Sequence, residues 1–341
     1  ELAGLAQEED TDSRIVRFHN NEWSVYHGPF SDFLQPCQGQ WTIMVQGVDR
    51  FIDEVSDLIR QFRLIPHWRM DDVMISYAVE GAGVGPHVDQ YDVFLLQGKG
   101  SRHWKVGKPA ALESVFPHPD LCQVEPFAPV INESLNPGDI LYIPPGWPHE
   151  GISLTPSMTY SVGFRAPDET NLASMLAEFT MASEFRATRY ADPQLSQRAH
   201  ASYITDEELA TLKDMLVKRV MSPDFESCLL QNLSESHLPL NVPEVLVSAD
   251  SLKESVTNDA WLALVPGCRP VCKTGTAHDS RFDFYIDGEH FSAPYEHHSL
   301  LLALFDTGRL AADPQILEKC NVEFWQLVSI LINKGYCEIL S

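Results

Sequence analysis

Short hydrophobic segments separated by glycine and proline dominate the first half of the chain, from residue 23 to about residue 166. Segments of this kind are typical of β-strands, and many of them in succession favour a sandwich or a barrel. One helix is expected at residues 51–62, where apolar side chains recur at helical spacing. The predicted strands lie at residues 41–45, 73–79, 91–96, 103–106, 140–143 and 160–164.

The pattern becomes helical in residues 168–236. Apolar side chains recur every three or four residues in two runs, 172–179 and 209–220, which predicts two helices. Thr205 and Glu208 form a capping box just before the second run. We therefore expect a small helical module. Its apolar stripes would either pack against one another within a bundle or form the seam of a dimer, and the sequence supports both equally.

The last part of the chain, residues 237–341, mixes strands and helices. Residues 282–286 alternate as a strand and run into an Asp-Gly pair, which favours a hairpin turn. Residues 323–334 form an amphipathic pattern closed by a glycine. Helices with a small hairpin indicate a winged-helix-like domain. Such folds often bind DNA, but this segment has seven Lys and Arg against fourteen Asp and Glu, so no direct DNA binding is expected.

The composition is that of a folded protein with an acidic surface. The 341 residues are 44% hydrophobic and 21% charged, with a net charge of −24, and the length allows two or three domains. This charge repels phosphate and makes a basic protein or peptide the natural partner. Seven scattered cysteines without a CxxC pair fit reduced thiols in the cytoplasm. No apolar run approaches the roughly 20 residues that span a bilayer, and the acidic start does not resemble a signal peptide.

Metal binding on a β scaffold needs ligands that point the same way, which in a strand means positions i and i+2. With 13 histidines and 48 acidic residues, chance alone would give about two His-x-acid triplets, and two occur. The pair His118 and Asp120 stands between prolines, which favours a solvated turn. The pair His87 and Asp89 runs into a strand and follows a glycine-rich entry that lets the backbone approach a bound group. We therefore favour His87 and Asp89 as ligands.

A third ligand is expected from another strand of the same barrel. The segment Gly-Asp-Ile-Leu-Tyr-Ile-Pro-Pro-Gly-Trp-Pro-His reads as a strand that stops at two prolines and presents His149 after a turn. Taken alone, His149 could be an ordinary core or loop histidine. Together with His87 and Asp89 it completes the two-histidine, one-carboxylate triad of non-haem Fe(II) oxygenases, which leaves coordination positions open.

Open positions imply a co-substrate that chelates iron, and 2-oxoglutarate would use two of them and leave one for dioxygen. Its distal carboxylate needs a fixed cation inside the barrel, for which arginine offers a bidentate fork. Alternation places Arg102 on one face with Trp104 and Val106, where burial without an anion would be costly. Arg102 is the favoured anchor, with Lys105 in reserve; otherwise Arg102 would reach solvent at a strand end.

Three segments carry a resemblance to the JmjC-domain ribosomal oxygenases: GVGPHVDQYDVF at 83–94, GDILYIPPGWPHEG at 138–151 and YSVGFRAP at 160–167. The resemblance covers nearly the whole chain and is strongest to the bacterial arginine hydroxylases of large-subunit ribosomal protein sixteen. It implies a mixed α and β fold: a cupin-type double-stranded β-helix, or jelly-roll barrel, in residues 1–167, a helical dimerisation module in 168–236 and a winged helix in 237–341. Because the chain opens on Glu1 rather than Met, we expect upstream residues that would belong to the barrel.

The resemblance also implies roles for individual residues. Relatives carry a serine that assists the co-substrate at the position of Ala78, so Tyr77 or a water would supply that contact here. Family members bind iron and 2-oxoglutarate at the positions of His87, Asp89, His149 and Arg102.

The resemblance further implies that a substrate arginine enters the site beside Asp72, Met74 and Tyr91, with Ser161 within reach. Asp72 could pair with the guanidinium while Met74 and Tyr91 enclose its aliphatic stem. From the residues alone, Asp72 could equally cap its strand, and Met74 and Tyr91 could equally belong to the barrel core.

The implied protein is a cytoplasmic, homodimeric dioxygenase that uses Fe(II), 2-oxoglutarate and dioxygen to hydroxylate an arginine of a basic ribosomal protein. Two other classes stay open. A metal-dependent cupin isomerase would keep the triad and need no 2-oxoglutarate, and a catalytically silent binding module would use the acidic surface to hold a basic partner. A histone-type lysine demethylase would be a variant of the same chemistry.

Overall fold

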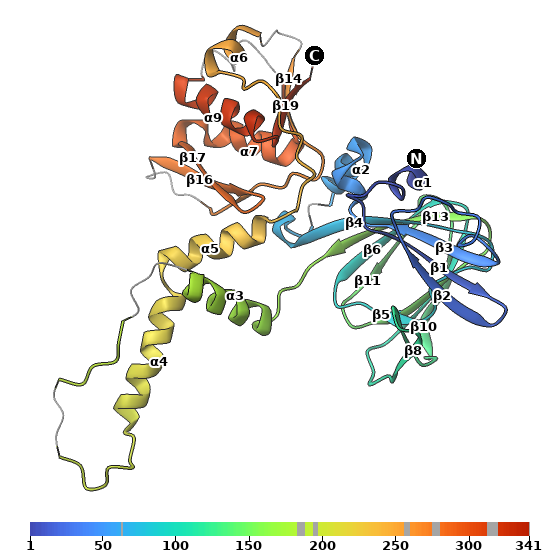
Figure 1. The fold of residues 1–341 in the computed structure, drawn as a ribbon, viewed down its shortest axis with the longest axis horizontal. Coiled ribbons are helices and arrows are strands. Elements are labelled where there is room, and N and C mark those ends of the chain that lie inside the picture. The colour runs from blue at the N-terminus through green and yellow to red at the C-terminus, as the bar shows by residue number, and fades with distance from the viewer. Residues whose placement is uncertain are drawn as a thin grey trace.

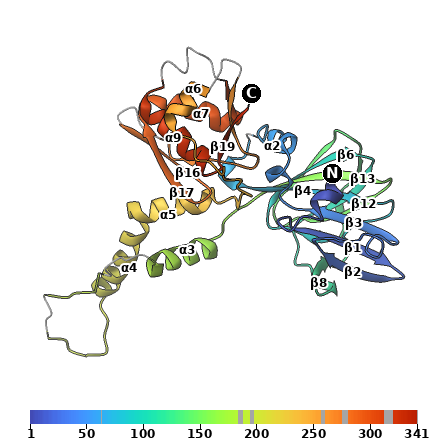
Figure 2. The ribbon, with the colours of Figure 1, turned by 45° about the horizontal axis from the view of Figure 1, so that its top comes forward.

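The computed structural model combines a β-barrel, a set of projecting helices and a C-terminal unit of helices and small sheets (Figures 1 and 2). No helix of the described part of the chain has the length and apolar character that crossing a bilayer requires. The structure describes residues 1–62, 64–182, 188–193, 197–255, 260–274, 280–311 and 320–340.

The larger sheet of the barrel is antiparallel and has seven strands in the order β11–β6–β13–β4–β3–β1–β2. Its central strands, β4 and β13, pair along almost their whole length. In chain order the seven are β1 (Ser13–His19), β2 (Glu22–His27), β3 (Gln40–Val45), β4 (Met70–Ala78), β6 (Asp92–Lys99), β11 (Ile140–Ile143) and β13 (Ser157–Phe164).

A four-stranded sheet faces the larger one, and the two enclose the barrel interior. Its order is β10–β7–β12–β5. Val93 and Leu95 of the larger sheet share one buried cluster with Trp104 and Val106 of the smaller sheet, so the sheets pack face to face. The smaller sheet consists of β5 (His87–Val88), β7 (Arg102–Gly107), β10 (Pro129–Leu135) and β12 (Pro148–Ser153).

Short helices cover the outer face of the larger sheet. They are α1 (Leu2–Leu5), η1 (Val48–Arg50) and α2 (Asp53–Ile59), while η2 (His67–Arg69) leads directly into β4 and has no buried residue. Val55 and Ile59 of α2 pack on the sheet, as helical spacing predicted. The predicted helix 51–62 was too long, because Phe62 leaves the helix and packs against Phe94 and Phe164 instead.

The barrel contains more strands than the hydrophobic pattern predicted. Each predicted strand exists, but β1 and β2 begin the barrel ten residues before residue 23, where the prediction started. The hairpin of β8 (Ser114–His118) and β9 (Leu121–Val124) was also missed. His118 therefore ends a strand, and only Asp120 lies in the exposed turn expected for both.

Three helices project from the barrel, namely α3 (Glu169–Ala182), α4 (Asp206–Val220) and α5 (Pro223–Ser234) (Figures 1 and 2). The capping box at the start of α4 is present, as predicted: Thr205 Oγ1 accepts from the Glu208 N–H, and the Glu208 carboxylate accepts from the Thr205 N–H. Neither α3 nor α4 has a buried residue. Phe179 of α3 packs against Phe225 of α5, with ring centroids 5.6 Å apart, whereas Leu212, Leu216 and Val220 of α4 stay exposed in the described part of the chain.

The C-terminal unit holds two three-stranded sheets and a core of aromatic and aliphatic side chains. The predicted hairpin is present, because Asp287 and Gly288 both adopt the positive φ that such a turn needs. The predicted helix appears as α9. The elements are α6 (Ala249–Ser255), β14 (Trp261–Leu264), β15 (Val271–Cys272), β16 (Arg281–Ile286), β17 (Glu289–Pro294), η3 (Tyr295–His297), α7 (His298–Thr307), β18 (Arg309–Ala311), α9 (Val322–Asn333) and β19 (Cys337–Leu340).

Candidate active site

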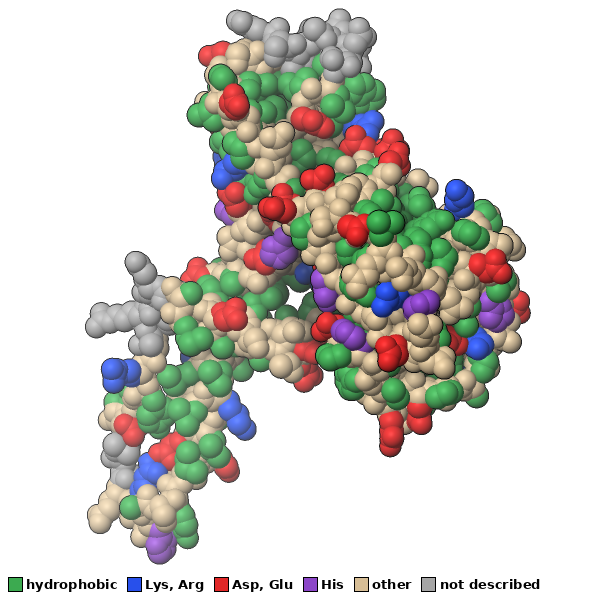
Figure 3. Space-filling view, turned by 45° about the vertical axis from the view of Figure 1, so that its right-hand side comes forward, with side chains coloured by type: hydrophobic (Ala, Val, Ile, Leu, Met, Phe, Trp, Pro, Cys, Tyr) green, Lys and Arg blue, Asp and Glu red, His purple; other side chains and the backbone are tan. Residues whose placement is uncertain are grey.

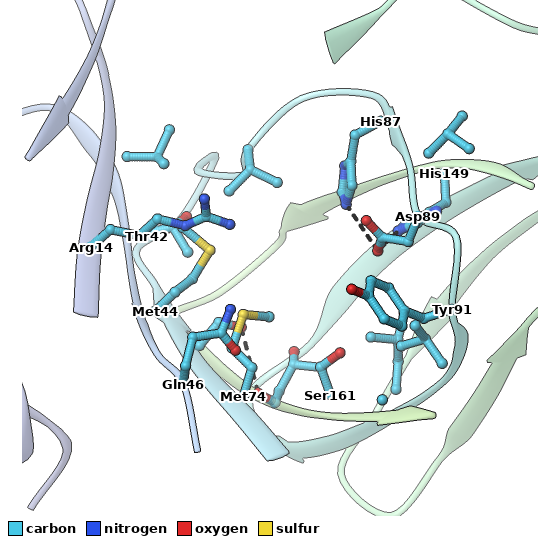
Figure 4. Close-up of a pocket in the computed structure, with 18 of the residues that line it drawn as sticks. Arg14, Thr42, Met44, Gln46, Met74, His87, Asp89, Tyr91, His149 and Ser161 are labelled. Atoms are coloured by element: carbon cyan, nitrogen blue, oxygen red, sulfur yellow. Dashed lines mark hydrogen bonds and ion pairs between the residues drawn. The ribbon is translucent and has the colours of Figure 1, made fainter. Parts of the chain in front are cut away.

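Two histidines and one aspartate meet at one end of a cavity of about 820 Å³ inside the barrel. His87 of β5 and His149 of β12 face each other across the ladder, with ring centroids 4.2 Å apart. Asp89 follows β5, and its Oδ2 lies 3.8 Å from His87 Nε2 and 3.5 Å from His149 Nε2. One ligand atom from each residue falls within 4.8 Å of the others, so the three could hold a metal ion (Figure 4).

Backbone carbonyls fix the orientation of both imidazoles. His87 Nδ1 lies 3.0 Å from the Gly85 carbonyl oxygen, and His149 Nδ1 lies 3.0 Å from that of Trp147. A carbonyl can only accept, so each Nδ1 carries the proton and each Nε2 lone pair is directed at Asp89. Burial, assisted by repulsion from His87, lowers the pKa of His149 to about 4 and keeps this ring neutral, as a metal ligand must be.

The glycines before His87 permit close backbone packing. A Cβ atom at Gly83 would lie 2.3 Å from the carbonyl oxygen of Gly151, and one at Gly85 would lie 2.2 Å from the side chain of Gln123. Gly85 also has a φ of +80°. The glycine-rich entry therefore lets the loop approach β12 and β9, whereas the sequence had suggested close approach to a bound group.

Arg102 lies buried in the same cavity, on the face shared with Trp104 and Val106 as alternation predicted. Its Nη1 donates to Ser76 Oγ at 3.3 Å and its Nη2 to the Gly151 carbonyl at 3.2 Å. The guanidinium stands 4.8 Å from the ring centroid of Trp104. A Cβ atom at Gly151 would lie 2.7 Å from that ring and 2.8 Å from Arg102 Nε, so glycine is needed there.

The Arg102 charge has no ion-pair partner among the described carboxylates. Burial alone lowers the pKa of Arg102 to about 10. Lys105, the reserve candidate, occupies the other face of β7 and pairs with Glu150 at 3.1 Å. Of the two cations, only Arg102 lines the cavity.

The serine beside the guanidinium is Ser76, two residues earlier in β4 than the expected position at Ala78. Ser76 lines the cavity, and its Oγ accepts from Arg102. Tyr77 was wrong as a substitute, because its side chain lies on the opposite face of the sheet, packed against Trp41 at 5.9 Å between ring centroids. A serine hydroxyl therefore contacts Arg102, at position 76 rather than 78.

The four side chains expected around a substrate arginine all line the cavity: Asp72, Met74, Tyr91 and Ser161. Met74 and Ser161 are direct neighbours across β4 and β13. Tyr91 is 42% exposed, which makes it a rim residue rather than barrel core. In Figure 4 its ring lies beside Asp89.

Asp72 is held by the backbone rather than by a cation. Its Oδ2 accepts the N–H of Gly47 at 2.8 Å. Burial, followed by repulsion from Asp49 and Asp71, raises the pKa of Asp72 to about 6. A cationic partner would therefore stabilise the ionised form of Asp72.

Further polar residues of the cavity escaped the sequence analysis. Ser76 and Thr159 continue the alternation of Met74 and Ser161 and could have been found by extending it. The buried hydroxyl of Thr42 has no hydrogen-bond partner within the described residues. Arg14 reaches the cavity from β1, a strand that the pattern did not predict, and lies on the wall opposite His87 (Figure 4).

Comparison with known proteins agrees with this geometry. The JmjC domain model matches residues 57–172. The chain is 39% identical to the ribosomal protein uL16 3-hydroxylase of Escherichia coli, over 98% of this chain and 88% of that protein. It is 31% identical to a probable ribosomal oxygenase of Haemophilus influenzae, over 79% of this chain and 70% of that protein.

Solved structures extend the similarity to the whole fold. The crystal structure of E. coli ycfD superposes with a TM-score of 0.90 at 38% identity, covering 99% of this chain and 90% of that one. The complex of the ribosomal oxygenase YcfD with cobalt and 2-oxoglutarate gives a TM-score of 0.87 at 36% identity, covering 100% and 90%. A His-Asp-His group inside a cupin-type barrel and 39% identity to a ribosomal protein hydroxylase over 98% of the chain lead to one conclusion: the chain belongs to the JmjC-domain ribosomal oxygenases.

Proposed function

We propose that this chain is an Fe(II)- and 2-oxoglutarate-dependent oxygenase that hydroxylates an arginine side chain of ribosomal protein uL16. The observation that carries the proposal is the presence, in one cavity, of three potential metal ligands and a buried guanidinium that has no carboxylate partner among the described residues. The ligand group is expected to bind a cation, and the unpaired guanidinium is expected to bind an anion. Together they match the cofactors of the family, Fe(II), 2-oxoglutarate and dioxygen.

His87, Asp89 and His149 would hold the metal. Their donor set of two imidazoles and one carboxylate is the facial arrangement that suits ferrous iron and leaves other positions free. With 2-oxoglutarate and dioxygen, the metal supplies the oxidation that converts a substrate C–H bond to C–OH and yields succinate and carbon dioxide. The protein orients the groups and excludes water.

Arg102 would bind the distal carboxylate of 2-oxoglutarate, with Ser76 beside it. Its guanidinium is already oriented by three contacts, so little side-chain entropy is lost when the anion binds. The anion would also neutralise a charge that is costly to bury.

The substrate arginine would enter between Asp72, Met74 and Tyr91, with Ser161 close by. Asp72 would pair with the guanidinium, and the thioether and phenol would contact its aliphatic part. The E. coli relative is named for its action on uL16, and ribosomal proteins are basic. A net charge of −24 supports electrostatic attraction of such a protein, although on the face seen in Figure 3 the acidic side chains are scattered, with Lys, Arg and His between them. A ribosomal substrate would place the enzyme in the cytoplasm.

The domain organisation is part of the proposal: a catalytic domain in residues 1–167, a dimerisation module in 168–236 and a winged helix in 237–341. The exposed apolar stripe of α4 supports a homodimer, while α3 packs partly within the module through Phe179 and Phe225. The exposed stripe of α4 includes Leu212, Leu216 and Val220.

The substrate assignment predicts that uL16 incubated with the enzyme, iron, 2-oxoglutarate and oxygen gains the mass of one oxygen atom on an arginine. Intact-mass analysis followed by fragmentation would locate it. Succinate formed without this mass gain would mean a different substrate. Metal binding without succinate would favour a cupin isomerase, and absence of both would favour a silent binding module.

The metal assignment predicts that Asp89→Ala abolishes both stoichiometric metal binding and succinate formation, because two neutral imidazoles alone hold ferrous iron weakly. Asp283→Ala is the matched control, since Asp283 pairs with His290 at 3.2 Å on the exposed surface of the C-terminal unit. Metal content and succinate yield would be measured for both. Full turnover by Asp89→Ala in added iron would rule the assignment out.

The anchor assignment predicts that Arg102→Ala raises the KM for 2-oxoglutarate by about tenfold to a hundredfold, the equivalent of one or two charge-assisted hydrogen bonds. Metal binding should survive. Lys105→Ala should leave this KM unchanged, because Lys105 pairs with Glu150 outside the cavity. Succinate formation at rising 2-oxoglutarate concentration distinguishes the two, and the reverse result would move the anchor to Lys105.

The pKa of Asp72 predicts a pH dependence for substrate binding. Since the pKa is raised to about 6, the carboxyl is protonated below that value and loses its attraction for a guanidinium. The KM for uL16 should then rise by about tenfold per pH unit as the pH falls below the pKa. Asp72→Asn should show a high KM at neutral pH and no such rise. A variant profile that kept the wild-type slope would assign the titration to another group.

A further inference from the structure

A loop of the C-terminal unit reaches into the side of the catalytic barrel. It lies between β14 and β15 and carries Arg269, which is only 9% exposed. Arg269 Nη2 donates to Asp49 Oδ2 at 2.6 Å, and Asp49 is fully buried. The two residues are 220 positions apart in the sequence. The pair joins the C-terminal unit to the 3-10 helix η1 beside the larger sheet.

The pair takes the place of a strand neighbour for the first half of β4. On one side, β4 pairs with β13 from Met70 to Ala78. On the other side, β3 reaches only Ile75, because the chain leaves the sheet after Val45. Residues 70–74 therefore have no strand of the described chain on that side, and their backbone groups need other partners.

Arg269 and Asp49 supply these partners. Arg269 Nη1 donates to the carbonyl oxygens of Met70 and Asp71, both at 3.0 Å. Asp49 Oδ1 accepts the N–H of Val73 at 2.8 Å. One ion pair thus satisfies three backbone groups and continues the hydrogen bonding of the sheet beyond the end of β3.

The segment held in this way forms a wall of the cavity. Asp71, Asp72 and Met74 all line it. The same C-terminal loop touches a second wall residue, because a Cβ atom at Gly267 would lie 2.9 Å from the Arg50 side chain and 3.1 Å from its Cα. The metal ligands and Arg102 are carried by β5, β7 and β12 and by the residues that follow β5, outside this segment.

We infer that Arg269 is a positioning residue for the oxygenase reaction, which acts through β4 by holding Asp72 and Met74 against the bound substrate. This inference rests on the proposed function for the role of Asp72 and Met74. On this inference, the C-terminal unit contributes to substrate recognition by supporting β4, and this role does not involve binding to nucleic acid. A backbone shift of about 1 Å at this wall would disturb alignment of the substrate but leave the metal and co-substrate subsites intact.

Arg269→Met tests the inference, because it keeps much of the side-chain length and removes every donor. The KM for uL16 should rise by about tenfold, the effect of one lost hydrogen bond to a charged group. The KM for 2-oxoglutarate should change by less than about twofold, since Arg102 is untouched. Arg269→Lys, which keeps the charge but not the fork, should recover part of the loss. Arg281→Met is the control, because Arg281 pairs with exposed Glu323 at 3.3 Å in the same unit.

A purely structural role would give a different result. If Arg269 only held the folded chain together, both KM values would stay constant and the rate would fall with the folded fraction. The double variant Asp49→Leu, Arg269→Met covers the case in which the single variant fails to fold, because it leaves no buried unpaired charge. It should fold and retain the raised KM for uL16. An unchanged KM in a folded variant would overturn the inference.

Amide hydrogen exchange separates this inference from the proposed function. In Arg269→Met or the double variant, residues 70–74 should exchange at least about tenfold faster than in wild type, while the ladder between β6 and β13 stays protected. If the wild-type enzyme does not hydroxylate uL16, the proposed function is wrong. The exchange rates of residues 70–74 would still show whether Arg269 supports β4. Unchanged exchange at residues 70–74 would overturn the inference whatever the substrate.

Discussion

The interior of this barrel depends on the buried positive charge of Arg102, which has no carboxylate partner among the described residues. Arg102 has a serine hydroxyl, a carbonyl oxygen and an indole ring around it, but no described carboxylate within ion-pair distance. Such an arrangement costs on the order of several kcal/mol in an isolated protein. The surrounding sheets must therefore be stable enough to tolerate it, and the two hydrophobic clusters on either side of the larger sheet provide that stability. An anion that enters the cavity would offset this desolvation cost, and the free energy recovered would contribute to its binding affinity.

Local sequence patterns were sufficient for the features that depend on alternation along one strand. The shared face of Arg102, Trp104 and Val106 follows from a period of two, and the structure has it. His87 and Asp89 were separated from the equally spaced His118 and Asp120 by their flanking residues alone, and among the described residues only the first pair meets a third metal-ligand candidate. The serine at position 76 was missed although the same period reaches it from Met74. The family resemblance had placed this serine at Ala78, whereas alternation along β4 places a cavity-facing side chain at Ser76.

Features that depend on chain segments far apart in the sequence had no local signal. Strand β1 mixes charged and apolar side chains, because one of its faces lines the cavity; Arg14 is an example. The support of β4 by Arg269 joins residues separated by more than half the chain. In the sequence, Arg269 is an arginine before a proline in a loop, and nothing around it indicates burial. Only the backbone of β4, with no strand beside its first half, shows why a cation is needed there.

Gly151 occupies a position of β12 where no larger residue fits beside Arg102 and Trp104. It stands two residues after His149, on the same strand, and the space that a Cβ atom would take is filled by the Trp104 ring and Arg102 Nε. The requirement for glycine thus comes from Trp104 and from Arg102, the proposed co-substrate anchor, and not from the proposed metal ligands. A barrel protein with a metal-binding histidine followed at this interval by a larger residue would have to place its anchor elsewhere.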